Sequence, residues 1–74
     1  MPDQMSADEQ RLVRVAAAFR LGGYVTSREA EDWLRLTHGT VSKAVRSGRL
    51  WGKREGHRIV VKAQDAERVL RGTP

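Results

Sequence analysis

The sequence predicts a small α+β domain that is mostly helical, and three observations support this. Apolar residues recur at helical spacing over most of the chain, and an alternating pattern replaces that spacing after Leu50. A length of 74 residues leaves room for one domain. No cysteine is present, so neither a disulfide framework nor a thiolate metal site stabilises the fold. We expect a disordered leader at 1–5 and one folded domain at 6–72.

A capping box opens the first predicted helix. Ser6 stands three residues before Glu9, so each side chain can satisfy the backbone amide of the other. The apolar residues that follow at helical spacing are expected to face the core: Leu12, Val13, Ala16, Ala17 and Phe19. Gly22 and Gly23 supply the left-handed conformation that ends this helix after Leu21.

The second predicted helix opens with another capping box, Thr26 to Glu29, after a short extended piece at 24–25. This helix is expected to end near Arg35. Its predicted buried stripe consists of Ala30, Trp33 and Leu34. Three acidic residues are expected on its exposed side, where they favour solubility: Glu29, Glu31 and Asp32.

The third predicted helix covers 38–47, with Thr37 as its N-cap and Gly48 closing its C-terminus. At about 100° per residue its polar residues fall within an arc of about 140°, and its valines lie on the opposite side. The polar side has the chemistry that reads base edges in a DNA major groove: His38, Gly39, Ser42, Lys43 and Arg46. Free amides at the helix N-terminus are expected to add an anion site beside Thr37.

A β-hairpin follows, with strands at 50–54 and 57–61 and a turn at 55–56, because β-branched residues are concentrated in the return strand. Trp51 is expected in the core. A last helix is predicted at 65–71. This element order, with a leading helix, two helices joined by a tight turn, a hairpin and a final helix, is that of a single winged helix-turn-helix domain.

Basic residues are concentrated in one part of the chain. From Arg35 to Lys62 there are eight basic residues and one acid, a net charge of +7, whereas the rest of the chain carries −2. A one-sided basic segment attracts polyanions such as nucleic acids. Hairpin residues are expected to grip phosphates or enter the minor groove: Lys53, Arg54, His57 and Arg58. Further contacts to the DNA backbone are expected from Thr26, Ser27, Arg28, Arg35, Thr37 and Arg49.

The residues give little support to catalysis or metal binding. His38 and His57 have no cysteine near them, and Ser42 has no histidine and acid at a spacing that suggests a relay. We therefore expect no enzyme activity, no cofactor and no metal. The sequence has no apolar run of the roughly 20 residues that a membrane span requires, and it shows no signal-peptide pattern. We therefore expect a cytoplasmic, nucleoid-associated protein.

Several segments resemble the winged helix-turn-helix of excisionases and MerR-type regulators. The resemblance spans 24–71 and is carried by Tyr24-Val25-Thr26-Ser27-Arg28-Glu29-Ala30, Trp33-Leu34-Arg35-Leu36-Thr37, Thr40-Val41, Ser47-Gly48-Arg49-Leu50 and Gly56-His57-Arg58. It implies a recognition helix at 38–47, a wing at 51–61 and double-stranded DNA as the partner. Small members of this kind act as excisionases, which redirect an integrase, or as transcription regulators, which implies integrase or RNA polymerase as a protein partner. The sequence departs from the family pattern at Arg35, where glycine is usual, and at Lys62, where proline is common.

A second resemblance, to ArsR-like repressors, comes from the leading helix at 6–21 and the run at 53–61. Those repressors have a longer third helix, so the excisionase-like interpretation is favoured. The dimerising helix of MerR regulators has no counterpart here, so self-association is expected through helix 6–21 or between neighbours on DNA. Two other interpretations stay open: an RNA-binding module, with Tyr24 and Trp51 as its stacking aromatics, and a protein adaptor such as a phage packaging or recombinase accessory subunit.

Overall fold

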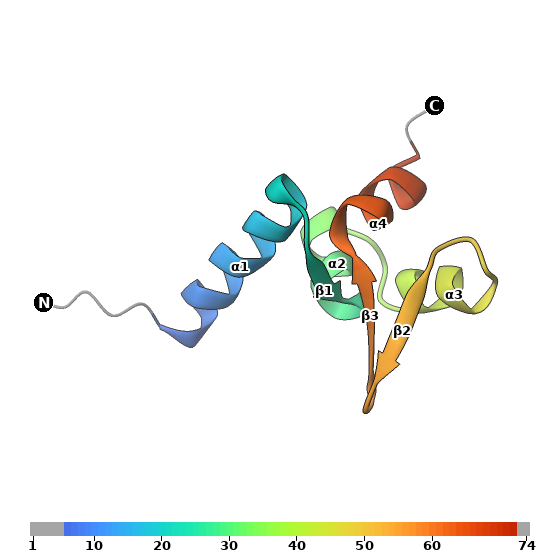
Figure 1. The fold of residues 1–74 in the computed structure, drawn as a ribbon, viewed down its shortest axis with the longest axis horizontal. Helices are drawn as coiled ribbons and strands as arrows, with labels where there is room; N and C mark the ends of the chain where they lie inside the picture. The colour runs from blue at the N-terminus through green and yellow to red at the C-terminus, as the bar shows by residue number, and fades with distance from the viewer. Residues whose placement is uncertain (1–5, 73–74) are drawn as a thin grey trace, which may run out of the picture.

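The computed structural model describes residues 6–72, which form four helices and one three-stranded antiparallel sheet (Figure 1). In chain order the elements are α1 (Ala7–Leu21), β1 (Tyr24–Thr26), α2 (Ser27–Leu34), α3 (Thr40–Arg46), β2 (Gly52–Glu55), β3 (Arg58–Lys62) and α4 (Ala63–Leu70). The predicted α+β class is therefore confirmed. The predicted leader at 1–5 lies outside the described residues.

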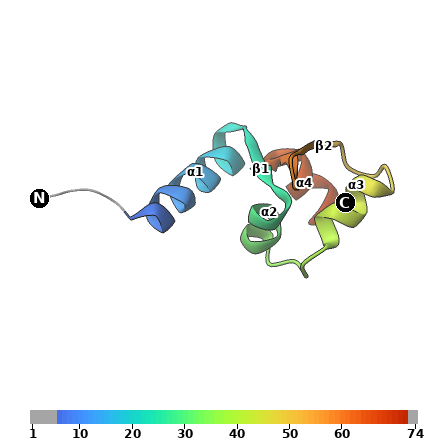
Figure 2. The same ribbon diagram turned by 90° about the horizontal axis from the view of Figure 1, so that it is seen from below.

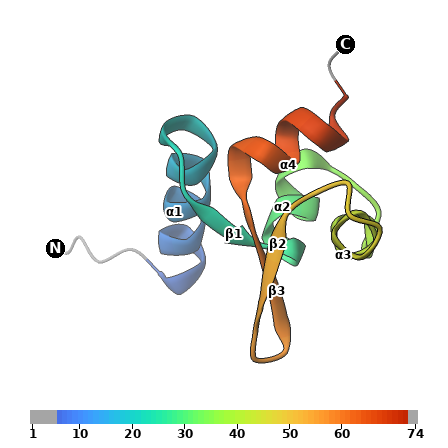
Figure 3. The ribbon, with the colours of Figure 1, turned by 45° about the vertical axis from the view of Figure 1, so that its right-hand side comes forward.

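The sheet has the strand order β1-β3-β2, so β3 is its central strand. Val25 of β1 pairs with Val61 of β3. The short extended piece predicted at 24–25 is therefore part of a third strand of the sheet. The β2–β3 hairpin projects beyond the helices (Figure 3). Its turn is Gly56 and His57, one position later than predicted, because Gly56 takes the left-handed conformation at φ 62° and Glu55 still pairs with Arg58.

Both predicted capping boxes are present. The Ser6 hydroxyl accepts from the amide of Glu9, and the Glu9 carboxylate accepts from the amide of Ser6. Thr26 and Glu29 repeat this exchange at the start of α2. Gly22, at φ 104°, ends α1 where the sequence predicts. These local rules hold because they depend on residues three or four positions apart.

The core lies between the helices and the inner side of the sheet. Its buried apolar members are Val15, Ala18, Phe19, Val25, Ala30, Leu34, Val41, Ala44, Leu50, Val61, Ala63 and Ala66. Among the largest fully buried side chains are three valines from three different elements, Val25, Val41 and Val61. The core therefore joins α3 to the sheet through small β-branched side chains.

Four apolar side chains expected in the core are exposed. Leu12 and Val13 are 59% and 55% exposed, because the N-terminal half of α1 extends past the rest of the domain (Figures 1 and 2). Trp33 is 39% exposed and stacks one ring face on Phe19, with centroids 5.4 Å apart. Trp51 is 56% exposed, because it lies before β2 at the edge of the sheet. The corresponding predictions are wrong.

The last helix begins at Ala63, two residues before the predicted start at Asp65. Ala63 and Ala66 are completely buried, and the Ala63 amide donates to the carbonyl of Gly23 at 2.9 Å. Packing against the chain after α1 thus fixes the start of α4 without a proline or a side-chain cap at Lys62. No helix among residues 6–72 combines the length and apolarity that crossing a bilayer requires.

Candidate nucleic-acid interface

The turn between α2 and α3 begins at Arg35, as predicted. Arg35 takes the left-handed conformation at φ 58°, and the amide of Leu36 donates to the carbonyl of Glu31 at 2.8 Å to close the end of α2. Side chains adopt this conformation at a cost of about 1 kcal/mol or more. The chain therefore turns at Arg35 without a glycine, and it carries a cationic side chain at the surface there.

The buried carboxylate of Glu31 fixes the start of α3. Glu31 is 2% exposed, and its Oε2 accepts from the amides of Gly39 at 2.9 Å and Val41 at 3.0 Å. As a result α3 begins at Thr40, two residues later than predicted, and its N-cap is Gly39 at φ 98°, not Thr37. Two further expectations are wrong. Glu31 does not lie on an exposed acidic side, and these amides form no anion site because the protein's own carboxylate binds them.

One side of α3 is buried and the other is exposed, as the spacing of its residues predicts. Val41 and Ala44 are 0% and 2% exposed, whereas Lys43 and Arg46 are exposed. Ser42 is partly buried. The helix is thus anchored by its apolar side and presents two cations to solvent.

Two hollows border α3 and bring residues from different elements together. The first, of about 710 Å³, is lined by residues that include Thr37, His38, Gly39, Lys43, Arg46 and Arg49. The second, of about 450 Å³, lies between α3 and the hairpin and is lined by Ser42, Val45, Arg46, Gly52, Lys53, Arg54 and Ile59. Arg46 belongs to both hollows. The predicted base-reading residues therefore adjoin two of the predicted hairpin residues.

Glycine at position 52 allows the hairpin to approach α3 this closely. A Cβ atom there would lie 2.8 Å from Cγ2 of Val45 and 3.0 Å from Cγ1 of Val61. Real Cβ contacts are essentially never as short as the one to Val45, and the one to Val61 would be tighter than nine in ten, so any side chain at this position must displace its neighbours. The width of the groove between α3 and β2 therefore depends on Gly52.

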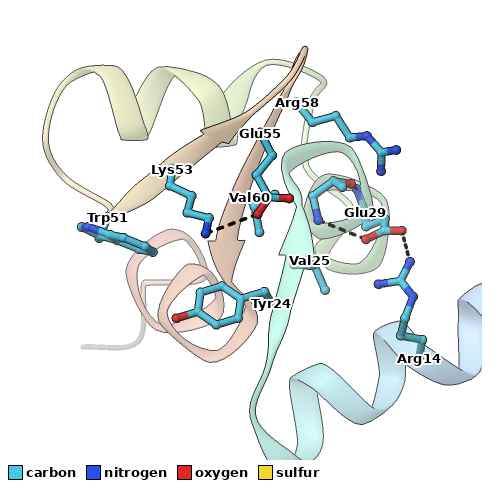
Figure 4. A pocket seen from close by; sticks show the side chains of 10 residues that line it. Arg14, Tyr24, Val25, Glu29, Trp51, Lys53, Glu55, Arg58 and Val60 are labelled. Carbon is cyan, nitrogen blue, oxygen red and sulfur yellow. Dashed lines mark hydrogen bonds and ion pairs between the residues drawn. The ribbon is translucent and has the colours of Figure 1, made fainter.

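Other residues predicted to contact DNA lie on different surfaces. Thr26 and Arg58 line a hollow of about 350 Å³ on the outer sheet face, which we define as the side of the sheet opposite Val25 and Val61 (Figure 4). Arg35 lines a groove between α1 and α2. Three more lie at the start of α2 or at the hairpin turn: Ser27, which is partly buried, and Arg28 and His57, which are exposed. The predicted contacts thus do not form one surface.

Glu29 ties α1 to α2 and is not free for solubility as expected. Its Oε2 accepts from Nη2 of Arg14, and its Oε1 accepts from the amide of Thr26 at 3.0 Å (Figure 4). Partial burial raises the pKa of Glu29, but the hydrogen bonds from Thr26 and the charge and hydrogen bond of Arg14 outweigh it. The net pKa lies below the ordinary value of 4.5.

Sequence reasoning missed the contact between Glu31 and the start of α3. The only signal for it was the position of Glu31 next to Ala30, within the buried stripe of α2. A carboxylate at such a position needs partners, because a buried charge is costly when it is unpaired. The distance of eight residues to Gly39 is not marked by any local pattern.

The described residues contain no group of three or more histidine, cysteine, aspartate or glutamate side chains placed to hold a metal ion. Comparison with protein-family models, with curated proteins and with solved structures found no significant match to this chain. A functional proposal therefore depends on the chemistry of the surfaces described above.

Proposed function

We propose that the chain is a winged helix-turn-helix domain that binds double-stranded DNA at specific sequences, with α3 in the major groove. The orientation of α3 carries this proposal: Val41 and Ala44 are buried, and Lys43 and Arg46 are exposed on the other side. An α-helix with its side chains is about 10–12 Å in diameter, which suits a major groove about 12 Å wide. Arginine and lysine donate to the O6 and N7 acceptors of guanine.

The hairpin supplies the second contact in this proposal. Arg54 lines the same hollow as Arg46 and lies on the side of β2 that faces α3, so a duplex against α3 also meets this cation. Contacts of this kind bind phosphates and fix the register of the protein without selecting a sequence. In the cell the domain would act as an excisionase-like recombination directionality factor or as a small transcription regulator, with integrase or RNA polymerase as its protein partner.

The test compares single substitutions in a DNA-binding assay. After selection of a preferred site from a random duplex pool, Arg46→Ala is expected to weaken binding to that site by about 1–3 kcal/mol and to relax the sequence preference. Arg54→Ala is expected to weaken binding to all duplexes alike and to reduce the salt slope by about 1. Arg11→Ala, on α1, is the matched control and should have little effect.

The same variants distinguish the adaptor interpretation. If the wild type does not bind any duplex even near 50 mM salt, where phosphate contacts are strong, duplex binding is wrong. If Arg46→Ala leaves cellular function intact and Arg11→Ala or Arg14→Ala abolishes it, the essential contact lies on α1. In that case the domain acts through a protein partner.

We also propose that two copies associate through α1, which gives the self-association expected from the sequence a specific geometry. Glu9, Leu12, Val13, Ala16 and Arg20 fall within an arc of about 100°, and Leu12 and Val13 are more than half exposed. An antiparallel pair of α1 helices centred between residues 14 and 15 brings Glu9 of one copy opposite Arg20 of the other. This pairing is two-fold symmetric and would present two α3 helices to a palindromic site.

Charge reversal tests this pairing. Glu9→Lys alone and Arg20→Glu alone should each weaken self-association, because like charges then face one another across the two-fold axis. An equimolar mixture of the two variants should form a heterodimer, since both charge pairs are restored. Sedimentation velocity measures the populations, and circular dichroism checks that loss of the Glu9 cap leaves α1 folded. A mixture that stays monomeric under conditions where the wild type dimerises contradicts the pairing, as does a monomeric wild type at high concentration.

A further inference from the structure

The outer sheet face carries two large aromatic side chains that the core does not use. Because Val25 and Val61 point inward, the alternation of strand residues places Tyr24 and Lys62 on the other side of the sheet. Tyr24 is 50% exposed and Trp51 is 56% exposed. Their ring centroids lie 6.3 Å apart at an interplanar angle of 63°, an edge-to-face contact (Figure 4).

These two rings differ from the other exposed aromatic side chain, Trp33. Trp33 covers part of the core by stacking on Phe19, so its position has a structural explanation. Tyr24 and Trp51 contact one another at the surface. Scattered exposed apolar residues are normal, whereas contiguous exposed apolar groups are more typical of binding surfaces.

Cations lie on the same sheet face as the two rings, and the acids close by are already paired. Glu29 accepts from Arg14 and from Thr26, and Glu55 lies 3.3 Å from Nζ of Lys53. Among residues 6–72 no acidic partner is found for Arg58 or Lys62, which are both exposed. The outer sheet face therefore combines two exposed ring systems with two uncompensated positive charges.

The hollow beside the rings has the size of a ligand site. Its volume is about 350 Å³, and its lining includes Tyr24, Trp51, Thr26 and Arg58. Pockets of about 300–1,000 Å³ are typical of sites for small organic groups. Figure 4 shows Tyr24 and Trp51 at one end of this hollow and Arg58 at the other.

We propose that the outer sheet face binds single-stranded nucleic acid, whose unpaired bases stack on Trp51 and Tyr24 while its phosphates contact Arg58 and Lys62. Stacking requires an exposed base face, which a base within a duplex does not offer. This site goes beyond the proposed duplex function and does not depend on it. Lys43 and Arg46, which carry that function, lie on α3 and line other hollows. The domain would thus hold a duplex and an unpaired strand at the same time, as at a melted or nicked junction.

Fluorescence of Trp51 provides a direct readout. In a Trp33→Phe background, which retains an aromatic ring against Phe19, Trp51 is the only tryptophan. Titration with a short oligothymidylate or oligouridylate, neither of which forms a duplex with itself, should quench its emission. The quenching should weaken as salt rises, because phosphates release counterions on binding. Comparison of the two oligomers shows whether the strand is DNA, RNA or either.

Substitutions separate this site from the duplex site. Trp51→Ala is expected to lower affinity for a labelled oligothymidylate about tenfold or more, and Tyr24→Ala by a smaller factor, because each removes a stacking surface. Lys43→Ala with Arg46→Ala should leave this affinity nearly unchanged while duplex binding is lost. Trp51→Leu repeats the test with less loss of apolar area, and thermal melting shows that each variant is folded.

Three results would overturn the proposal. One is the absence of quenching at low salt by both oligomers. Another is equal single-strand affinity of the wild type and a folded Trp51→Ala. A third is loss of single-strand binding in the Lys43→Ala, Arg46→Ala double variant, which would mean that strands bind to α3. Amide chemical-shift changes in the wild type provide an independent check and should cluster at Tyr24, Trp51 and Lys62.

Discussion

Removal of the Glu31 carboxylate should destabilise the domain strongly, because this side chain holds the start of α3. Glu31→Ala deletes two hydrogen bonds between a charged acceptor and backbone amides, at 2.9 and 3.0 Å, one of them to the buried residue Val41. Bonds to charged groups contribute about 1.5–3 kcal/mol each. Because the start of α3 can relax and admit water, we expect a loss of about 3 kcal/mol. A domain of this length has a total stability of about 4–11 kcal/mol.

Thermal and urea unfolding, followed by circular dichroism, measure this loss. A change of 3 kcal/mol should lower Tm by about 12–24 °C. Glu31→Gln keeps an acceptor without its charge and should lose about half as much. Asp32→Ala, at an exposed position where the only described contact of the side chain is with His38 at 3.4 Å, is the matched control and should change stability by less than about 0.5 kcal/mol. If Glu31→Ala is as stable as this control, the carboxylate does not hold α3, and the reasoning is refuted.

Three further predictions concern stability. Gly52→Ala should cost about 1–3 kcal/mol in urea unfolding, because its Cβ would meet Val45 and Val61 at 3.0 Å or less; an unchanged midpoint would contradict the close approach. Glu29 has a lowered pKa in the folded state, so its contribution is present above pH 4.5 and is lost as the pH falls through the folded pKa. Glu29→Gln should therefore flatten the acid side of the stability profile, and a parallel profile would contradict this. Arg35→Gly should raise stability by about 0.5–1 kcal/mol, since glycine adopts φ 58° without strain, and a lower Tm would show that the Arg35 side chain is needed.

Local chemistry explains why much of the fold could be predicted. The capping boxes at Ser6 and Thr26 and the helix end at Gly22 depend on bonds within one turn of helix, which the sequence shows directly. The inward side of α3 also follows from spacing, because Val41 and Ala44 are three residues apart. Winged helix-turn-helix membership and DNA binding, by contrast, stay predictions.

Tertiary packing explains what the sequence did not predict. Hydrophobicity placed Trp33 and Trp51 in the core, but the buried side chains are mostly alanine and valine, and both tryptophans lie at the surface, Trp33 as a cover on Phe19. Glu31 resembles its acidic neighbours in sequence and differs from them only because the turn after α2 returns the chain past its carboxylate. Neither outcome depends on residues close in the chain, so no local pattern could show them.

The alternation of side chains along β2 divides one basic run in the sequence between two surfaces. Arg54 is on the same side of the strand as Gly52, which faces α3, whereas Lys53 is on the outer sheet face with Arg58. A charge cluster that appears continuous in sequence is therefore not one binding patch. Substitutions at the neighbouring positions 53 and 54 should for this reason affect binding of different ligands. Arg54→Ala should weaken binding to the duplex, and Lys53→Ala should weaken mainly binding to the single strand. A common effect of both on one ligand would mean that the hairpin acts as a single contact.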